Sequence, residues 1–571
     1  MGSLAAPLMP HLLLAPIVLP MLTAALMLLL KEERQRLKLT LNIGSTFLGL
    51  LAAVALLRWV DHQSEPATLG VYLPGNWPAP FGIVLALDRL SALMLVLAGT
   101  LGLASAVYAA ARWHRAGVHF HPLFQLQLMG LAGAFLTADL FNLFVFFEIL
   151  LAASYGLLLH GSGRPRVAAG LHYVAVNLAA SSLFLIGASM LYGITGTLNM
   201  ADLARAVPLV APADRGLLHA AAAIPGVAFL IKAAQWPLNF WLVPAYAAAT
   251  APVGALFAIM TKVGVYVVLR LWTLLFGSEA GDSALFGAQW LVAGGLLTLG
   301  AAAVGTLSAQ RLGHLAGYGA IVSAGTLVAA IGFGQNVLVA GALYYLVSAT
   351  LAVGMLFLLA DLIERWRNDG ASVAPHARGD VAPFLAPDLR ASDAAGIDDE
   401  PQDLIVGRPI PAAAAFLGIA FMACTLLLAG LPPLSGFVGK FAMLGAVLNP
   451  LGLGSSYGQQ PGWAGWTLLA LLIGSGLLSL LALSRAGIRH LWAPQGRDAP
   501  QLRLAEGLPV AALLLLCVLL TVKAGAVMRY TQATADALFA PEVYVRSVLG
   551  ARPVPSPEAS AAAAAAVEGA R

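Results

Sequence analysis

The sequence has little charge and almost no cysteine. Only 10% of its 571 residues are charged and 60% are hydrophobic, whereas water-soluble domains carry about a quarter charged residues, so a water-soluble fold is excluded. The two cysteines, Cys424 and Cys517, lie far apart inside apolar runs, which leaves no disulfide framework and no metal-ligand spacing. The net charge of +4 is small for this length and lies in loops, which argues against a nucleic-acid partner.

Apolar runs long enough to cross a membrane recur from one end of the chain to the other. A helix needs about 20 mainly apolar residues to span a bilayer. The sequence therefore predicts an all-α polytopic membrane protein of about fourteen transmembrane helices. They are expected at residues 9–30, 38–58, 82–110, 122–137, 140–160, 168–193, 218–243, 250–276, 286–308, 314–333, 336–363, 411–446, 464–485 and 507–528.

Two stretches lack this apolar pattern. Residues 365–409 mix Asp, Arg, Pro, Gly and Ala, and residues 531–571 end in an alanine run. We interpret the first as a hydrophilic loop and the second as a flexible C-terminal tail. Residues 1–530 are expected to form a single transmembrane domain.

Basic residues follow alternate spans. Loops on the cytoplasmic side of a membrane are richer in Lys and Arg than exported loops, and here the basic loops follow the odd-numbered spans. Arg205 and Arg215, after the sixth span, are the main exception. We therefore expect both termini on the non-cytoplasmic side of a bacterial inner membrane. The basic residues that follow odd spans are Lys31, Arg34, Arg36, Lys38, Arg112, Arg115, Arg164, Arg166, Arg311, Arg365, Arg367, Arg485, Arg489, Arg497 and Arg503.

Three of the six lysines, Lys232, Lys262 and Lys440, lie inside predicted spans. A charged lysine at a helix centre costs about 2.5 to 3.5 kcal/mol on insertion scales. A single such lysine can reach an interface with its flexible stem, but three together favour a function. Glu148 lies in an equally apolar run and needs a cation nearby to remain ionised. Asp139, at the start of the same helix, is better interpreted as a helix N-cap.

Prolines interrupt two of the lysine-bearing spans. Pro237 follows Lys232, and Pro432 and Pro433 precede Lys440. A proline inside a helix frees a backbone carbonyl, which membranes tolerate where it meets protein or a hydrated cavity. The interrupted spans are the seventh and the twelfth, five apart, which favours two inverted five-helix repeats formed by spans 4–8 and 9–13.

These residues suggest a relay of protons. Burial disfavours the charged form of a lysine and a nearby carboxylate favours it, so Glu148 could control proton release from Lys232. Lys262 would then pass the proton towards Lys440. His314 and Tyr318 are lesser candidates for the second step, and His314 is more simply interpreted as an interfacial histidine beside Arg311.

Several local motifs resemble a known family. They are Phe146-Phe-Glu148, Lys232-Ala-Ala-Gln-Trp-Pro237, Thr261-Lys262-Val-Gly-Val-Tyr266 and Leu431-Pro-Pro-Leu-Ser-Gly436. Together they resemble the proton-translocating antiporter family of the complex I membrane-arm subunits and the Mrp-type (Pha-type) antiporters. Residues 191–202 and 315–326 look most similar to the D subunit of the Mrp type. Unlike some complex I relatives, the eleventh span lacks a basic residue.

The resemblance implies a specific activity. Glu148 and Lys232 would form a charge pair, Lys262 would be the central relay and Lys440 the terminal one. The chain would act without a cofactor as a transporter subunit rather than an enzyme. It would work inside a hetero-oligomer that exchanges Na⁺ or K⁺ for protons.

Three alternatives differ in class. A proton-pumping subunit of a quinone- or hydrogenase-linked complex would use the same charges, with its cofactors on other chains. A haem enzyme would need paired histidines inside spans, whereas the histidines lie near span ends. A purely structural scaffold leaves the buried lysines unexplained. The histidines near span ends are His114, His119, His121, His160 and His172.

Overall fold

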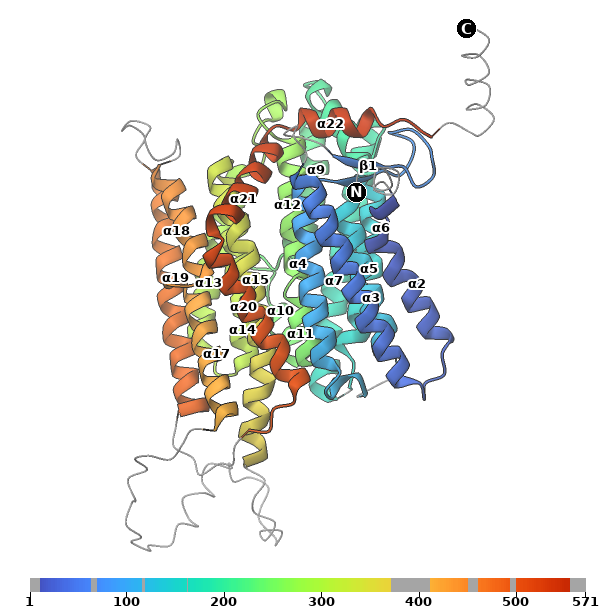
Figure 1. Cartoon of the computed structure of the whole chain (residues 1–571). Coiled ribbons are helices and arrows are strands. Elements are labelled where there is room, and N and C mark those ends of the chain that lie inside the picture. The colour runs from blue at the N-terminus through green and yellow to red at the C-terminus, as the bar shows by residue number, and fades with distance from the viewer. Residues whose placement is uncertain are drawn as a thin grey trace, which may run out of the picture.

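The computed structural model describes residues 11–62, 69–115, 119–161, 163–370, 411–449, 461–492 and 500–554. They form a bundle of roughly parallel helices (Figure 1). Twelve of the described helical stretches are long and apolar enough to cross a membrane. Two shorter apolar helices, α2 (Ala15–Leu29) and α18 (Ser435–Leu448), add to these. The predicted all-α polytopic membrane fold is therefore confirmed, whereas the two five-helix repeats stay a prediction.

The first half of the bundle runs from α2 to α12. Its long helices are α2 (Ala15–Leu29), α3 (Gln35–Asp61), α4 (Arg89–Ala109), α5 (Phe120–Leu136), α6 (Leu140–Leu158) and α7 (Arg164–Thr195). They are followed by the shorter α8 (Met200–Ala206) and by α9 (Arg215–Lys232), α10 (Leu242–Ala248), α11 (Ala251–Phe257) and α12 (Met260–Leu275). A two-stranded antiparallel hairpin of β1 (Gly70–Tyr72) and β2 (Leu85–Leu87) joins α3 to α4.

The second half runs from α13 to α22. It comprises α13 (Ala288–Ser308), α14 (Leu312–Gly332), α15 (Asn336–Gly370), α17 (Ala412–Ala429), α18 (Ser435–Leu448), α19 (Trp463–Gly487), α20 (Leu504–Val522), α21 (Ala524–Phe539) and α22 (Glu542–Leu549). Single turns of 3₁₀-helix lie at Trp113–Arg115, Val207–Leu209 and Gly281–Ser283, and a π-turn at Ile488–Trp492. Residues 371–410, most of the predicted hydrophilic loop, lie outside the described residues.

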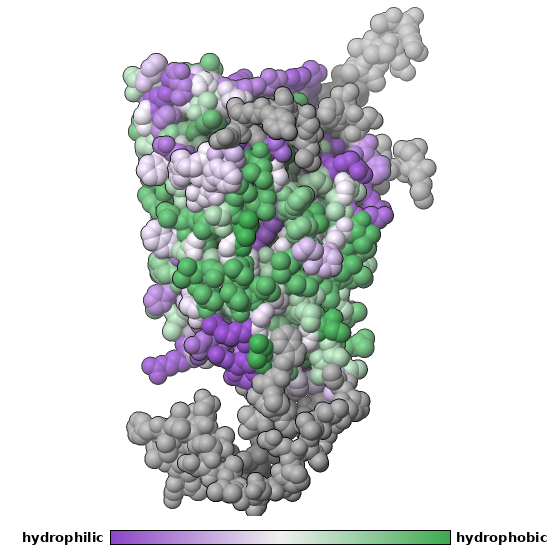
Figure 2. Space-filling model, turned by 90° about the vertical axis from the view of Figure 1, so that its left-hand side faces the viewer, coloured by the Kyte–Doolittle hydropathy of each residue, from purple (hydrophilic) through white to green (hydrophobic). Residues whose placement is uncertain are grey.

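Apolar side chains cover the sides of the bundle. Figure 2 shows a broad hydrophobic belt around the middle of the bundle, and both ends are more hydrophilic than this belt. The most buried of the candidate spans is α11–α12, in which a stretch of 18 residues is completely buried. A side chain in α12 therefore meets protein rather than lipid, which is where membrane proteins keep their ionisable groups.

Arginines from distant loops gather at one end of the bundle. Glu506, at the start of α20, is buried and pairs with Arg365 at 2.6 Å and with Arg112 at 3.3 Å. Arg503 donates to the Ala111 carbonyl at 2.6 Å. We call this the arginine-rich end. It joins residues that follow the third, eleventh and thirteenth predicted spans, and of these Arg365 lies in the last turns of α15.

The C-terminal segment packs on the opposite end. The last part of α21 and all of α22 lie within residues 531–571, which the sequence assigned to a flexible tail, so helical structure extends to Leu549. They are ordered because they bury a face each: Leu538 and Val548 are shielded, and Tyr530 donates to the Arg89 carbonyl at 2.8 Å. Figure 1 shows α22 lying across this end of the bundle.

Candidate functional site

Lys232 is buried at the last residue of α9. Its Nζ donates to Ser181 Oγ on α7 at 3.4 Å and lies 5.0 Å from the centre of the Phe147 ring on α6. It lines a small cavity of about 10 Å³, together with Asn177 and Tyr246. That volume is close to the minimum needed for one water molecule. The ammonium thus meets one hydroxyl and an aromatic face.

The chain breaks directly after Lys232. Gln235 N–H donates to the Leu230 carbonyl and Ala234 N–H donates to the Ile231 carbonyl, both at 2.9 Å. This pair of bonds is the Schellman ending of a helix. Ala234 accordingly takes a left-handed conformation with φ +53°, which usually favours glycine. The helical path resumes only at α10, beyond Pro237, so the prediction of an interrupted seventh span is matched by the backbone.

Glu148 lies on α6 one residue after Phe147 and is half-buried. Its Oε1 is shielded and has no hydrogen-bond partner among the described residues. No ion pair joins it to Lys232 in the described part of the chain, although the two charges lie within electrostatic range. The structure therefore brings the predicted pair into one region without direct contact.

Lys262 is the third residue of α12 and is shielded on all sides. Its Nζ donates to Ser323 Oγ at 2.5 Å and to the Ala320 carbonyl at 3.3 Å, both on α14, and to Thr261 Oγ1 at 3.2 Å. A short break between α11 and α12 places this lysine in the first turn of α12. Its partners are all neutral oxygens.

Lys440 is buried in the second turn of α18. Its Nζ donates to the Ala429 carbonyl at 3.0 Å and to the Leu428 carbonyl at 3.5 Å. Both carbonyls belong to the last turn of α17, where helical carbonyls lack an intrahelical donor. Pro432 and Pro433 form the exposed turn between the two helices. The break in the twelfth span thus supplies the acceptors for Lys440.

Hydroxyl groups line the space between α14, α15 and α18. Tyr345 on α15 lies near Thr326 on α14, one turn along from Ser323. Ser348 Oγ on α15 lies 2.8 Å from Ser435 Oγ at the start of α18. These groups lie on helices α14, α15 and α18, and Ser348 and Ser435 form a hydrogen-bonded pair among them.

No hydrogen bond or ion pair joins the lesser candidates to the lysines in the described part of the chain. His314 lines a cavity at the arginine-rich end. Tyr318 packs so closely against Gly305 of α13 that a Cβ there would overlap its ring. Asp139 caps α6, accepting from the Asn142 N–H at 2.8 Å, and its burial raises the pKa of its carboxyl. Asp139 and Tyr318 thus each have a structural contact that accounts for their positions.

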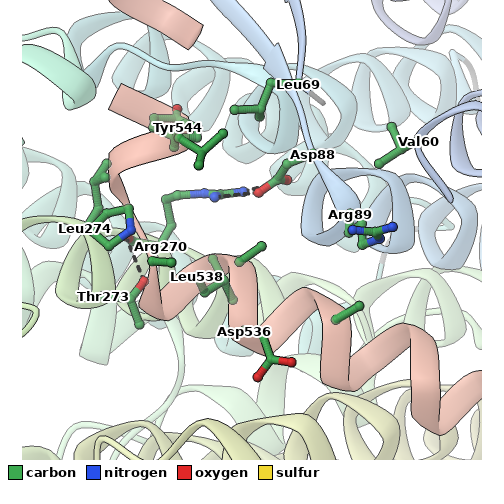
Figure 3. Close-up of a pocket in the computed structure, with 15 residues that line it drawn as sticks. Val60, Leu69, Asp88, Arg89, Arg270, Thr273, Leu274, Asp536, Leu538 and Tyr544 are labelled. Carbon is green, nitrogen blue, oxygen red and sulfur yellow. Dashed lines mark hydrogen bonds and ion pairs between the residues drawn. The ribbon is translucent and has the colours of Figure 1, made fainter. Parts of the chain in front are cut away.

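A second buried charge pair is not evident from the sequence. Arg270 on α12 and Asp88, the N-cap of α4, form two short contacts, 2.6 Å and 2.7 Å. The Arg270 guanidinium also lies 5.2 Å from the Tyr544 ring centre on α22. Figure 3 shows the pair beside a cavity of about 360 Å³. The sequence feature that could have indicated this pair is Arg270 itself, a charged residue inside the predicted eighth span.

No cluster of three or more His, Cys, Asp or Glu suited to a metal ion occurs among the described residues. Cys424 and Cys517 are both buried and free. What the site offers is a set of ammonium groups held by neutral oxygens. Such groups can gain or lose a proton, and they lie in a bundle that excludes bulk water.

Comparison with known proteins identifies relatives along the whole chain. Residues 137–375 match the transmembrane family described as NADH:quinone oxidoreductase/Mrp antiporter. The D subunit of a probable K⁺/H⁺ antiporter of Rhizobium meliloti is 51% identical over 95% of this chain and 98% of its own length. The D subunit of a Na⁺/H⁺ antiporter of Alkalihalophilus pseudofirmus is 31% identical over 95% of this chain and its full length, 100%.

The fold is shared with two kinds of complex. A chain of the Mrp complex of Dietzia has a TM-score of 0.77 with 25% identity, covering 95% of this chain and 99% of its own. A chain of respiratory complex I of Thermus thermophilus has a TM-score of 0.70 with 22% identity, covering 95% of this chain and 100% of its own. The second likeness shows the fold alone.

Proposed function

The chain belongs to the family of the D subunits of Mrp-type monovalent cation/proton antiporters, and on this premise we propose that it carries protons between buried ionisable side chains. Glu148, Lys232, Lys262 and Lys440 would be the groups that hold the proton in turn. The observation that carries this proposal is the surroundings of the three lysines. Among the described residues, no carboxylate lies within ion-pair distance of any of them.

A lysine without a paired carboxylate can exchange its proton. A buried ion pair fixes the charged state, because separating the proton leaves an uncompensated charge. Hydroxyl and carbonyl oxygens accept hydrogen bonds from an ammonium without adding a full negative charge. The described contacts of Lys232, Lys262 and Lys440 are of this second kind. Each is therefore suited to pass a proton on rather than to hold a fixed charge.

Helix ends give the lysines different affinities for charge. The N-terminal end of a helix carries partial positive charge and the C-terminal end partial negative charge. Lys262 lies in the first turn of α12, which opposes a positive ammonium, whereas Lys440 donates to the last carbonyls of α17, which favour it. We infer that this difference draws a proton from Lys262 towards Lys440.

Glu148 would regulate the first step. Its shielded Oε1 lacks a partner among the described residues, and Lys232 contacts the neighbouring Phe147 instead. A rotation of the Glu148 or Lys232 side chain would bring the two charges together. When the Glu148 carboxylate is close to Lys232, it would hold the proton on the lysine. When the two side chains separate, Lys232 would release the proton towards Lys262.

We place the chain in a hetero-oligomer of the bacterial inner membrane that exchanges Na⁺ or K⁺ for protons. The names of its relatives support both cations. The arginine-rich end would face the cytoplasm, so that both termini lie on the other side. Residues 1–530 would form one transmembrane domain, and the breaks after Lys232 and before Lys440 would occupy equivalent places in two inverted five-helix repeats.

A redox-driven proton pump is the second candidate. The N subunit of the NADH-quinone oxidoreductase of Desulforudis audaxviator is 33% identical over 72% of this chain and 74% of its own length. That similarity is lower and shorter than the similarity to the antiporter protein of Rhizobium meliloti. Purification of the native complex separates the two: small hydrophobic subunits indicate the antiporter, and flavin or iron–sulfur subunits the pump.

Everted membrane vesicles test the relay. We expect Glu148→Ala, Lys232→Ala and Lys440→Ala each to lower cation-driven proton exchange at least tenfold while the complex still assembles. Lys523→Ala is the matched control, because Lys523 is exposed at the end of α20. Wild-type exchange in all three buried variants, with normal assembly, would contradict the proposal.

A further inference from the structure

A cavity of about 1070 Å³ opens at the arginine-rich end, between α7, α10, α14 and α15. Arg166, Arg311 and Arg367 line it, each from a different helix or helix cap. Glu364 is the single carboxylate among its lining residues. Three guanidinium groups and one carboxylate leave a charge of +2 even with the two lining histidines neutral, so the cavity attracts anions.

Contacts within the chain fix the walls of the cavity without removing its positive charge. Glu364 lies near the Leu312 N–H at the start of α14. Arg166 Nε donates to the Ala248 carbonyl at 2.9 Å, which holds this arginine on the cavity wall. Arg311 and Arg367 are exposed. Because a guanidinium has five N–H donors, each arginine can keep a wall contact and still present donors to a ligand.

One wall of the cavity is apolar. Phe240 and Pro244 line it from the interrupted segment that follows Lys232. Phe240 is 57% exposed, and Trp236 and Leu238, in the same segment of the chain, are also exposed apolar side chains. On α7, the exposed Leu171 lies in the same region of the helix as the cavity-lining residues. A basic mouth therefore adjoins an apolar surface that faces away from the bundle core.

We propose that this cavity binds the phosphate of an anionic phospholipid headgroup, with the acyl chains lying along the apolar surface beside Phe240. Arginine pairs with phosphate oxygens through two parallel N–H donors. Basic pockets between transmembrane helices are typical binding places for acidic headgroups. A free phosphate ion would satisfy the arginines but would leave the adjoining apolar wall unused, which is why the lipid is favoured.

Native mass spectrometry of the detergent-purified chain, with the subunits that co-purify, tests this site. Phosphatidylglycerol is titrated against wild type and an Arg311→Gln/Arg367→Gln double variant. Because each basic residue contributes about fivefold to the binding of an anionic lipid surface, we expect the first lipid to bind about 25-fold more weakly to the double variant. Phosphatidylcholine, which has the same chains but no net charge, should not form the tight adduct.

The matched control is an Arg164→Gln/Arg489→Gln double variant. Both arginines are exposed near the same end but do not line the cavity, so this variant should bind phosphatidylglycerol as wild type does. Inorganic phosphate and glycerophosphoglycerol, which lack acyl chains, should not displace the lipid at millimolar concentration. Equal weakening in both double variants, or displacement by inorganic phosphate, would overturn the assignment to a lipid.

Discussion

Lys262 Nζ lies 2.5 Å from Ser323 Oγ, so a hydroxyl on α14 holds an ammonium on α12 inside the bundle. The Ser323 hydroxyl itself lies 2.9 Å from the Ala320 carbonyl, which also accepts from Lys262. These groups form a compact set of neutral oxygens around one nitrogen. The arrangement allows Lys262 to be charged or neutral without leaving a buried carboxylate unpaired.

Ser323→Ala should slow proton exchange. The substitution removes the shortest contact of Lys262 and leaves the two weaker ones. A hydrogen bond to a charged group contributes about 1.5 to 3 kcal/mol, so we expect at least a tenfold lower exchange rate in everted vesicles. Ser189→Ala is the control, because Ser189 is exposed on α7 and donates only to its own helix. Unchanged exchange by an assembled Ser323→Ala complex would remove Ser323 from the path.

Gly476→Ala should displace the Lys440 side chain. A Cβ at Gly476 would overlap the Ala429 carbonyl oxygen and lie 3.2 Å from Lys440 Nζ. Overpacking of this kind costs about 1 to 3 kcal/mol, and here it acts on the donor and on its acceptor. We expect a marked loss of exchange in everted vesicles. Gly474→Ala on the same helix has nothing within 4 Å of the new Cβ and should behave as wild type.

The Asp88–Arg270 pair should stabilise the connection between the start of α4 and α12. Arg270→Ala leaves Asp88 buried without its cation, which costs about 3 to 5 kcal/mol. We expect a clearly lower thermal unfolding temperature in detergent. The double variant Asp88→Asn/Arg270→Gln removes both charges and should recover much of that loss. A double variant as unstable as the single one would show that packing, rather than charge, is what matters.

The same pair gives stability a dependence on pH. Burial alone would raise the pKa of Asp88, but the Arg270 guanidinium outweighs it and lowers the pKa below the ordinary value. A depressed carboxyl pKa stabilises the folded state above the unfolded-state value, about 3.9. That contribution is lost as the pH falls through the lower, folded-state value. Unfolding scans between pH 7 and pH 3 should therefore show a larger acid loss for wild type than for Asp88→Asn/Arg270→Gln.

Much of the architecture could be predicted from the sequence, because hydrophobic length alone marks a membrane span. The same reasoning located Lys232, Lys262 and Lys440, since a lysine in an apolar run stands out. It also identified the breaks at Pro237 and Pro432, where proline removes a backbone donor.

Contacts between distant residues could not be predicted in this way. Asp88 and Arg270 are 182 positions apart, and nothing local indicates that α4 and α12 meet. The relation of Glu148 to Lys232 depends on side-chain conformation, so that the sequence indicated the pair but not its separation. Helix α22 was missed because it packs on one end of the bundle and is too short to give a membrane signal.

The most direct measurement compares Lys262→Arg with wild type in everted vesicles. Arginine keeps the positive charge and hydrogen-bond donors of lysine but does not release its proton in proteins. If Lys262 passes protons, Lys262→Arg should be as inactive as Lys262→Met in a fully assembled complex, while Lys523→Arg keeps wild-type exchange. Wild-type exchange by Lys262→Arg would contradict the account, because a fixed charge would then suffice.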